Sequence, residues 1–260
     1  MSRGRGPRPK TRLDALLVLR GLTPSREKAQ ALVMAGQVLV AGQVVDKPGK
    51  AVSADAQIEL IGPEHPWVSR GGVKLAGALE TFALQVDGFR CLDVGASTGG
   101  FTHVLLRRGA GAVVAVDVGK GQLHWSLRND PRVKVVEGVN ARYLQPEQVG
   151  ANFDLVTVDV SFISLRLVLP ALVPLVRPGG WLLCLVKPQF EAGRGEVGRR
   201  GVVKDETVRR KAIEGVAAFA QSLGLALQGR CPSPIPGPAG NLEEFLLLQK
   251  RPGENSSLHG

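Results

Sequence analysis

The sequence contains 260 residues, of which 44% are hydrophobic, so the chain can bury the core of one large domain and one small one. No apolar run reaches the ~18 residues that a membrane-spanning helix needs, because the most apolar region, LVTVDVSFISLRLVLPALVPLV, is interrupted by Asp159, Arg166 and two prolines. The formal net charge of +10 suits a phosphate-rich partner, although charge alone also fits a solvated surface. These features exclude a helical membrane protein and predict an ordinary globular one.

The chain ends and the cysteines indicate the compartment. Five of the first twelve residues are Arg or Lys, but no apolar segment or small-residue cleavage site follows, so this segment is not a secretory signal. Cys91 and Cys184 lie inside apolar, strand-like runs, which is typical of reduced core thiols, and no Cys/His spacing suggests zinc. We therefore expect a cytoplasmic protein without a metal site, with flexible tails at 1–9 and 252–260.

Residues 10–65 predict a small module of two helices and a hairpin. In TRLDALLVLRG the leucines fall on one helical face, and Thr23-Pro24 offers an N-cap and a first-turn proline for a second helix. The stretch AGQVLVAGQVVDK alternates around Ala41-Gly42 and indicates a hairpin. Such a small core is more typical of a binding module than of an enzyme. The candidates for phosphate contact on its helices are Arg12, Arg26 and Lys28.

A second basic cluster, RGEVGRRGVVK, lies at residues 194–204 and is rich in glycine. Flexible basic segments suit a phosphate backbone, so we expect RNA contacts from Arg194 and Arg199, with Arg200 beside them. A solvated surface charge is the alternative for each of these basic residues.

From residue 88 onward, short apolar strands alternate with helical or loop stretches, which indicates an α/β domain with a mostly parallel sheet. The predicted strands are 89–93, 112–117, 133–136, 153–159, 180–186 and 243–249. Ligands bind such sheets at the carboxyl ends of the strands. The residues that directly follow the strands are therefore the candidates for a functional site.

The stretch CLDVGASTGGFT at 91–102 predicts a strand followed by a tight glycine turn. Phe101 stands where a phosphate-binding P-loop requires lysine, and the glycine spacing does not fit a dinucleotide fingerprint. A carboxylate at the strand end, Asp93, would repel a pyrophosphate but attract a cation. S-adenosylmethionine carries a sulfonium and an ammonium group and no phosphate, so it fits this turn, and Asp117, about 20 residues on, suits its ribose hydroxyls. Two aspartates that cap ordinary turns are the alternative. The predicted cofactor contacts are Asp93, Gly95, Ala96, Ser97, Thr98, Gly99, Gly100 and Asp117.

The later strand ends bear on which atom is methylated. Residues 153–159 lead into VDVSFIS rather than the [DN]-P-P-[FY] motif that clamps an exocyclic amine, and no Pro-Cys nucleophile pair is present. Methylation of a base is therefore disfavoured. Two lysines and two acids are expected instead at the rim of one sheet, namely Lys74, Asp159, Lys187 and Glu243. Ordinary surface charges are the alternative for each of the four.

The sequence resembles the TlyA family, which joins an S4 RNA-binding domain to an FtsJ-like (RrmJ-type) methyltransferase domain. The similarity runs over almost the whole chain and includes WVSRGGVKL, CLDVGASTGGFT, DVGKGQLHWSLRNDPRV, NAR, VDVSFISL, LVKPQFE and PGPAGNLEEF. It implies a Rossmann-like, S-adenosylmethionine-dependent α/β methyltransferase domain at 87–251, preceded by a linker and first helix at 66–86 and a small α+β S4 domain at 10–65. It also implies 2′-O-methylation of cytidines in the ribosomal RNA of both ribosomal subunits, which would be the partners.

The resemblance also assigns roles to residues. The family's catalytic Lys-Asp-Lys-Glu tetrad falls on Lys74, Asp159, Lys187 and Glu243. The GN-x-E spacing favours Glu243 over the adjacent Glu244 for the last position. Further cofactor contacts are expected at Asn140, Ala141 and Asp159. Arg70, within WVSRGGVKL, is a further candidate for RNA contact.

These residues predict a mechanism without a metal. Lys187, held near Asp159, would orient the ribose 2′-hydroxyl and help to deprotonate it, while the methyl group of the cofactor lies in line behind. Burial and the neighbouring charge of Lys74 would make Lys187 easier to deprotonate. Two other functions stay open: a non-catalytic ribosome-binding protein of the same fold, and a membrane-active haemolysin, a name that some family members carry.

Overall fold

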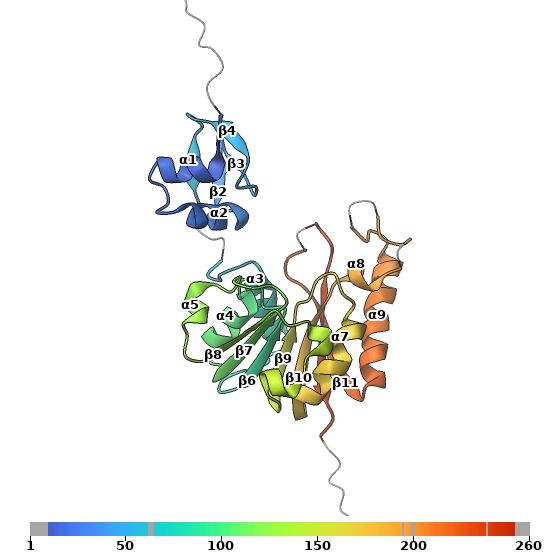
Figure 1. Ribbon diagram of the computed structural model, residues 1–260. Helices are drawn as coiled ribbons and strands as arrows, with labels where there is room; N and C mark the ends of the chain where they lie inside the picture. The colour runs from blue at the N-terminus through green and yellow to red at the C-terminus, as the bar shows by residue number, and fades with distance from the viewer. Residues whose placement is uncertain (1–9, 62–64, 194, 199–200, 238, 253–260) are drawn as a thin grey trace, which may run out of the picture. The chain divides into compact units, whose positions relative to one another are not determined.

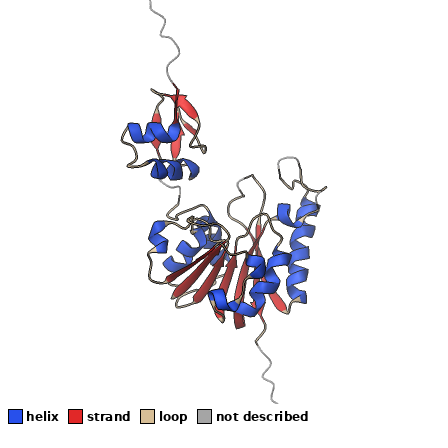
Figure 2. Cartoon of the chain, in the orientation of Figure 1, coloured by secondary structure: helices blue, strands red, loops and turns tan. Residues whose placement is uncertain are grey.

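The computed structural model describes residues 10–61, 65–193, 195–198, 201–237 and 239–252 (Figure 1). The chain divides into two compact units, Met1–Pro66 and Trp67–Gly260. Figure 2 shows that both units contain helices and strands, and that the larger unit is built on one extended sheet.

The first unit packs two helices, α1 (Leu13–Leu19) and α2 (Arg26–Met34), against two small antiparallel sheets. One sheet pairs β1 (Lys10–Arg12) with β4 (Ala51–Ser53). The other has the order β3-β2-β5 and contains β2 (Val38–Val40), β3 (Gln43–Val44) and β5 (Ile58–Leu60). The helices and sheets share a small apolar core that includes Leu13, Leu17 and Val33.

The predicted helix pair and hairpin of the first unit are confirmed. Ala41 and Gly42 join β2 to β3 with φ values of +51° and +75°, and positive φ at both central residues is what a two-residue hairpin turn favours. Two details of the prediction are wrong. Ser25 rather than Thr23 caps α2, because the Ser25 side chain accepts a backbone N–H of the first turn while Thr23 is buried. Arg12 ends β1 and does not belong to the first helix.

The second unit is built on a seven-stranded sheet with the strand order β11-β12-β10-β9-β6-β7-β8. Five strands run parallel to one another: β6 (Arg90–Val94), β7 (Ala112–Asp117), β8 (Val133–Glu137), β9 (Phe153–Val158) and β10 (Val176–Val186). Antiparallel pairing joins β12 (Glu244–Lys250) to β10 and to β11 (Leu225–Pro232). After β8 the chain returns to the other side of β6, and such a reversal of strand order opens a crevice at the carboxyl ends of the strands.

Helices cover both faces of this sheet (Figure 1). One face packs against α3 (Gly71–Thr81), α4 (Gly100–Arg107) and α5 (Trp125–Arg128). The other face packs against α7 (Leu165–Leu172) and α9 (Glu206–Ser222). Helices bury both faces of the sheet, and successive side chains of a strand point to opposite faces. The parallel strands are therefore continuous apolar runs in the sequence. The remaining short helices are η1 (Ala141–Tyr143), α6 (Pro146–Val149), η2 (Val173–Leu175) and α8 (Pro188–Glu191).

The six predicted strands are confirmed, and the α/β class with a mostly parallel sheet is correct. The largest shift is in β10, which begins at Val176 rather than 180 because a register irregularity between Val176 and Trp181 accommodates the RPGG turn sequence. The edge strand β11 was not predicted, because its sequence, LALQGRCP, mixes polar residues and a glycine into a half-exposed segment. Both core thiols are confirmed as free and buried, and burial raises the pKa of Cys184 to about 12.

Candidate active site

The carboxyl ends of β9 and β10 place the first ion pair of the site. The two strands are parallel neighbours, so the residues that follow Val158 and Val186 meet at one edge of the sheet. Lys187 Nζ lies 2.6 Å from Asp159 Oδ1 and donates a hydrogen bond of 2.8 Å to Ser161 Oγ. The side chains of Lys187 and Asp159 are only 11% and 20% exposed, so the pair is largely withdrawn from solvent.

The second ion pair joins α3 to the start of β12. Because β12 runs antiparallel to β10, its first residues lie at the edge where the parallel strands end. Lys74 of α3 donates a hydrogen bond of 2.5 Å to Glu243 Oε2, and both side chains are buried. Glu244 instead pairs with Arg230 of β11 at 2.5 Å. Successive residues of a strand face opposite sides, so Glu243 and not Glu244 reaches the site.

A hollow of about 340 Å³ brings the two ion pairs to one place, because Lys187 and Glu243 both line it. Two buried oxygens of its lining residues, Glu243 Oε1 and Gln189 Oε1, have no hydrogen-bond partner within the described part of the chain. Buried acceptors without partners are costly unless a ligand or water satisfies them. The hollow therefore has the character of a binding site for a molecule that carries polar hydrogens. Its other lining residues include Ser161, Phe162, Phe190 and Asn241.

Glu191 ties together the loops that follow β9 and β10. Its carboxylate, at the end of α8, accepts hydrogen bonds from Ser164 Oγ at 2.6 Å and from Leu165 N at 2.7 Å, where α7 begins. Burial raises the pKa of Glu191, although these hydrogen bonds act in the opposite direction. The two loops that carry the first ion pair are thus held at their far ends as well.

Asn241 holds the wall of the hollow near Glu243. The buried Asn241 side chain accepts a hydrogen bond of 2.9 Å from Val203 N and donates one of 2.8 Å to Gly201 O. Sequence patterns did not point to Asn241, Ser161 or Glu191. Each lies two to four residues from a predicted site residue, and that proximity was the available signal.

Four backbone N–H groups of the glycine turn donate hydrogen bonds inside the protein. Hydrogen bonds of 2.7–3.0 Å run from the N–H groups of Gly95, Ala96, Ser97 and Gly99 to Val116 O, Asp117 Oδ2 and Ala96 O. A phosphate-binding turn needs such groups free and pointing at the ligand. The turn is therefore a poor cradle for a polyphosphate, which agrees with the sequence-based exclusion.

Close packing explains two of the glycines in this turn. Gly95 has a φ of +84°, and a Cβ added there would lie 2.5 Å from the backbone oxygen of Asp159. Gly100 begins α4 where a Cβ would overlap Ser69 Oγ. The turn thus touches the residue that holds Lys187, while Ser97 and Thr98 stay exposed on its outer side.

Asp117 lies where the sequence placed it, at the end of β7. Its carboxylate accepts backbone hydrogen bonds of 2.8 Å from Ser97 N and 2.7 Å from Gly119 N. Each carboxylate oxygen keeps a further lone pair for a ligand hydroxyl. Asn140 and Ala141 follow the neighbouring parallel strand β8 and so lie at the same edge, with the Asn140 side chain capping η1.

Asp93 is buried near the end of β6. The side chain is 0% exposed, and its carboxylate accepts hydrogen bonds from Thr102 Oγ1 at 2.7 Å and Thr157 Oγ1 at 3.1 Å. Burial raises the pKa of Asp93 to about 6, against the opposing effect of the two hydroxyls. The Asp93 carboxylate thus faces the hydroxyl of Thr102 on α4, and its contact with the cofactor stays a prediction. The contacts of Asp93 anchor the first turn of α4, which follows the glycine turn.

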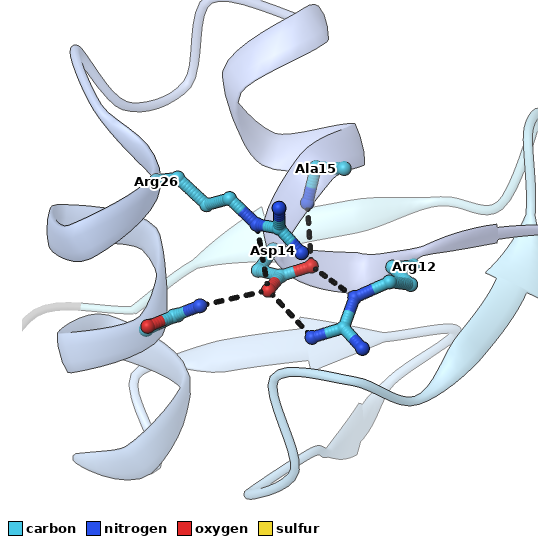
Figure 3. A network of polar contacts seen from close by, with 5 residues as sticks. Arg12, Asp14, Ala15 and Arg26 are labelled. Atoms are coloured by element: carbon cyan, nitrogen blue, oxygen red, sulfur yellow. Dashed lines mark hydrogen bonds and ion pairs between the residues drawn. The ribbon is translucent and has the colours of Figure 1, made fainter.

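Two of the three predicted RNA contacts of the first unit meet at one acid. Arg12 of β1 and Arg26 of α2 both donate to the buried carboxylate of Asp14, as Figure 3 shows. Lys28 is exposed on α2, and Arg70 is exposed where α3 begins. Three predicted contacts lie outside the described residues, namely Arg194, Arg199 and Arg200.

Two kinds of feature are absent from the described residues. None of their helices is both long enough and apolar enough to cross a membrane. Likewise, no three His, Cys, Asp or Glu residues among them form a group that could hold a metal ion.

Comparison with known proteins identifies the family. A family model described as FtsJ-like methyltransferase matches residues 67–251, and a model of the S4 domain matches residues 11–58. The chain is also 53% identical over 252 residues to the 16S/23S rRNA (cytidine-2′-O)-methyltransferase TlyA of Mycobacterium tuberculosis, a match that covers 96% of this chain and 94% of that protein. The chain belongs to the TlyA family of FtsJ-like methyltransferases. The predicted resemblance, the Rossmann-like methyltransferase fold and the enzyme class are thereby confirmed.

Other relatives of this TlyA-family chain carry a different name. Hemolysin A of Brachyspira hyodysenteriae is 39% identical, with 89% of this chain and 97% of that protein covered. A solved structure of a Streptococcus thermophilus protein named as a hemolysin has a TM-score of 0.74 and 43% identity, covering 97% of this chain and 93% of that one. The haemolysin name, which was expected for some members of the family, is thus found among its relatives.

Proposed function

We propose that the chain transfers a methyl group from S-adenosylmethionine to the ribose 2′-oxygen of cytidines in the ribosomal RNA of the small and large subunits. The observation that carries this proposal is the convergence of the Lys187–Asp159 and Lys74–Glu243 pairs at one hollow on the carboxyl edge of a methyltransferase sheet. The M. tuberculosis relative supports the choice of substrate, because its name states this reaction on 16S and 23S rRNA.

The glycine turn supports S-adenosylmethionine as the cofactor. Its inward-directed N–H groups disfavour a phosphate, and S-adenosylmethionine has none. The free lone pairs of Asp117 suit ribose hydroxyls, and the turn adjoins Asp159 through Gly95. When bound, S-adenosylmethionine supplies an electrophilic methyl group on a sulfonium. The residues proposed to hold it are Gly95, Ala96, Ser97, Thr98, Gly99, Gly100, Asp117, Asn140, Ala141 and Asp159.

Lys187 is the proposed general base, and its ion pair and hydrogen bond support that role. An amine nitrogen has four tetrahedral positions, one of which is its bond to carbon. Ser161 Oγ accepts a hydrogen bond of 2.8 Å at one of the remaining three, and Asp159 Oδ1 forms an ion pair with Nζ at 2.6 Å. A further position holds a lone pair in the neutral amine and an N–H in the ammonium. Lys187 can therefore take the proton of a 2′-hydroxyl bound in the hollow while it keeps its hydrogen bond to Ser161.

The second ion pair is proposed to fix the hydroxyl and balance the charge. Lys74 is held by one oxygen of Glu243, and the other oxygen, Oε1, is a buried acceptor without a partner among the described residues. That oxygen suits a ribose hydroxyl of the substrate. Each lysine of the tetrad has its own carboxylate, so the charges of the four side chains balance once Lys187 has taken the proton of the hydroxyl. The acid–base contribution is about 10²- to 10⁴-fold in rate, and positioning of the reactants supplies the larger part.

The first unit is proposed to supply affinity for ribosomal RNA. An S4 domain with exposed basic residues and a chain charge of +10 both suit a phosphate backbone. A protein that modifies ribosomal RNA works where ribosomes are assembled, and this supports the predicted cytoplasmic location. Arg12, Arg26, Lys28 and Arg70 are the described candidates for contact.

The test is methyl transfer to purified ribosomal subunits with S-adenosylmethionine labelled in its methyl group. We expect the label on the ribose 2′-oxygen of cytidines, identified by nuclease digestion and mass spectrometry, and its loss with Lys187→Ala. Label on a base would overturn the assignment of the acceptor atom. Binding to subunits without any transfer would favour the non-catalytic alternative, and leakage of lipid vesicles caused by the purified protein would favour the haemolysin.

A further inference from the structure

Asp14 is a wholly buried carboxylate at the meeting point of three elements of the first unit (Figure 3). Oδ1 accepts hydrogen bonds from Arg12 Nε at 3.1 Å and Ala15 N at 2.9 Å. Oδ2 accepts from Arg12 Nη2 at 2.9 Å, Arg26 Nε at 3.1 Å and Gln30 Nε2 at 3.0 Å. These donors come from β1, α1 and α2, so a single carboxylate links all three.

The carboxylate stays ionised in this setting. Burial alone would favour the neutral acid, because removing a charge from water is costly. The hydrogen bond from Arg12 is the largest of the effects that hold the pKa of Asp14 well below its usual range, and Arg26 and Gln30 act in the same direction. Asp14 therefore provides a fixed negative charge beneath two guanidinium groups.

The two guanidinium groups are only partly used by Asp14. Their side chains remain 53% and 54% exposed. Arg12 commits its Nε and one Nη2 hydrogen, and Arg26 commits its Nε, so most of the hydrogens of each five-donor fork remain for another acceptor. The Arg12 guanidinium also lies close to Gly49, where an added Cβ would be 3.2 Å from Arg12 Nη1.

Two half-exposed guanidinium groups converge on one acid, which leaves the cluster with a positive charge facing solvent. Repulsion between them is offset by Asp14, so the pair owes its spacing to this residue. Paired guanidinium groups in a fixed geometry match the oxygens of phosphates.

We propose that Asp14 is a positioning residue for RNA binding, which holds Arg12 and Arg26 as a fixed pair for backbone phosphates. The proposal rests on the proposed function, because it takes ribosomal RNA as the ligand. A negative residue thereby strengthens the binding of a negative polymer.

Asp14→Asn tests this proposal, because the proposal and general electrostatics predict opposite changes in RNA affinity. The substitution keeps the side-chain volume and raises the net charge of the chain by one, so general electrostatics alone predicts tighter RNA binding. Loss of the fixed pair predicts weaker binding, and we expect a loss of about tenfold at near-physiological salt. The slope of log affinity against log salt should also fall by about 1 to 2 as phosphate contacts are lost.

A matched control removes the same charge elsewhere in the first unit. Glu59 is exposed on β5, so Glu59→Gln leaves the Asp14 cluster intact, and its affinity should equal or slightly exceed that of the wild type. Hydrogen exchange of the α1 and α2 amides checks that the first unit of the full chain remains folded. In an Arg12→Gln, Arg26→Gln background, Asp14→Asn should cause no further loss.

The outcomes separate the two claims. If the wild type fails to bind purified ribosomal subunits, the proposed function fails. If the wild type binds and a folded Asp14→Asn variant binds equally well or more tightly, only the role of Asp14 is overturned. If Asp14→Asn unfolds the first unit, the conservative variants Arg12→Lys and Arg26→Lys test the proposal instead. Each keeps its charge but loses the guanidinium fork and should bind several-fold more weakly, and wild-type affinity in both would overturn the proposal.

Discussion

Each of the two compact units buries an aspartate completely, Asp14 in α1 and Asp93 at the end of β6. Their surroundings differ. Asp14 receives hydrogen bonds from two guanidinium groups, whereas Asp93 receives hydrogen bonds from the hydroxyls of Thr102 and Thr157. The pKa of Asp14 is lowered by its cations, and the pKa of Asp93 is raised by burial to about 6. The balance between burial and charged partners therefore decides the charge of each acid.

This difference follows the division of labour between the units. The first unit uses its aspartate as a permanent anion that directs cations outward, which suits binding. The second unit keeps Asp93 under α4 and places its paired charges, Lys187–Asp159 and Lys74–Glu243, at the edge of the sheet, where chemistry can occur. Binding and catalysis should therefore respond to different substitutions.

The largest effect is expected from Lys187→Ala. Methyl transfer should fall by orders of magnitude, while the fold and most of the RNA affinity remain, because the amine acts chiefly in the transition state. Lys134→Ala is the control, because Lys134 is exposed on β8 and its substitution removes the same positive charge. Single-turnover rates and RNA binding should be measured on both variants.

Lys187→Arg sharpens the same point. A guanidinium keeps the positive charge but does not give up its proton, so this variant should be nearly as slow as Lys187→Ala. Turnover close to the wild-type rate at saturating RNA would show that Lys187 acts only as an electrostatic clamp.

Glu243→Gln should have the next largest effect. Breaking a buried pair leaves the Lys74 ammonium without its carboxylate, which costs about 3 kcal/mol of unfolding free energy. Glu244→Gln is a matched control on the adjacent residue, because its partner Arg230 is partly exposed and such pairs contribute less than about 1 kcal/mol. The free energy of unfolding and the rate of methyl transfer should be measured on both variants. Equal changes in Glu243→Gln and Glu244→Gln would contradict the assignment of Glu243.

The two buried aspartates should give opposite pH dependences. The pKa of Asp93 is about 6 when folded and near the ordinary 3.8 when unfolded, so the folded state binds more protons between these values and loses stability as the pH rises from 4 to 6. Asp14 has a lowered pKa, so its contribution is present above the unfolded value and is lost on acidification.

Asp93→Asn tests this contrast. The amide of the variant does not ionise at any of these pH values, whereas the wild type loses stability as Asp93 ionises. The melting temperature of the variant relative to that of the wild type should therefore rise between pH 5 and pH 7.5. Glu147→Gln, an exposed acid of the same unit, should show no such trend. A constant difference at both pH values would mean that Asp93 does not titrate in this range.

The smallest effect is expected from Glu191→Gln. The amide keeps one acceptor oxygen for Ser164 and Leu165 but loses the second, so the loops that carry Lys187 and Asp159 should loosen slightly. A few-fold fall in kcat with little change in KM is expected, and Glu214→Gln on α9 serves as the control. An unchanged kcat would remove Glu191 from the account of the site.

Local patterns in the sequence predicted what depends on neighbours along the chain. The parallel strands were readable from apolar runs, and Asp159 and Lys187 from their place directly after such runs. Contacts between distant segments were not readable in this way. Arg12 and Arg26 converge on Asp14, and Asp93 is covered by Thr102, only because helices fold back over strands. The direction of a side chain at a strand end is set by that packing.

The most direct test of the account is nucleotide-resolution mapping of ribose methylation in ribosomal RNA from cells that lack this protein and express either the wild type or Lys187→Ala. The account predicts 2′-O-methylated cytidines with the wild type and their absence with Lys187→Ala at equal protein levels. Equal methylation with both proteins, or no wild-type-dependent ribose methylation at any cytidine, would contradict it.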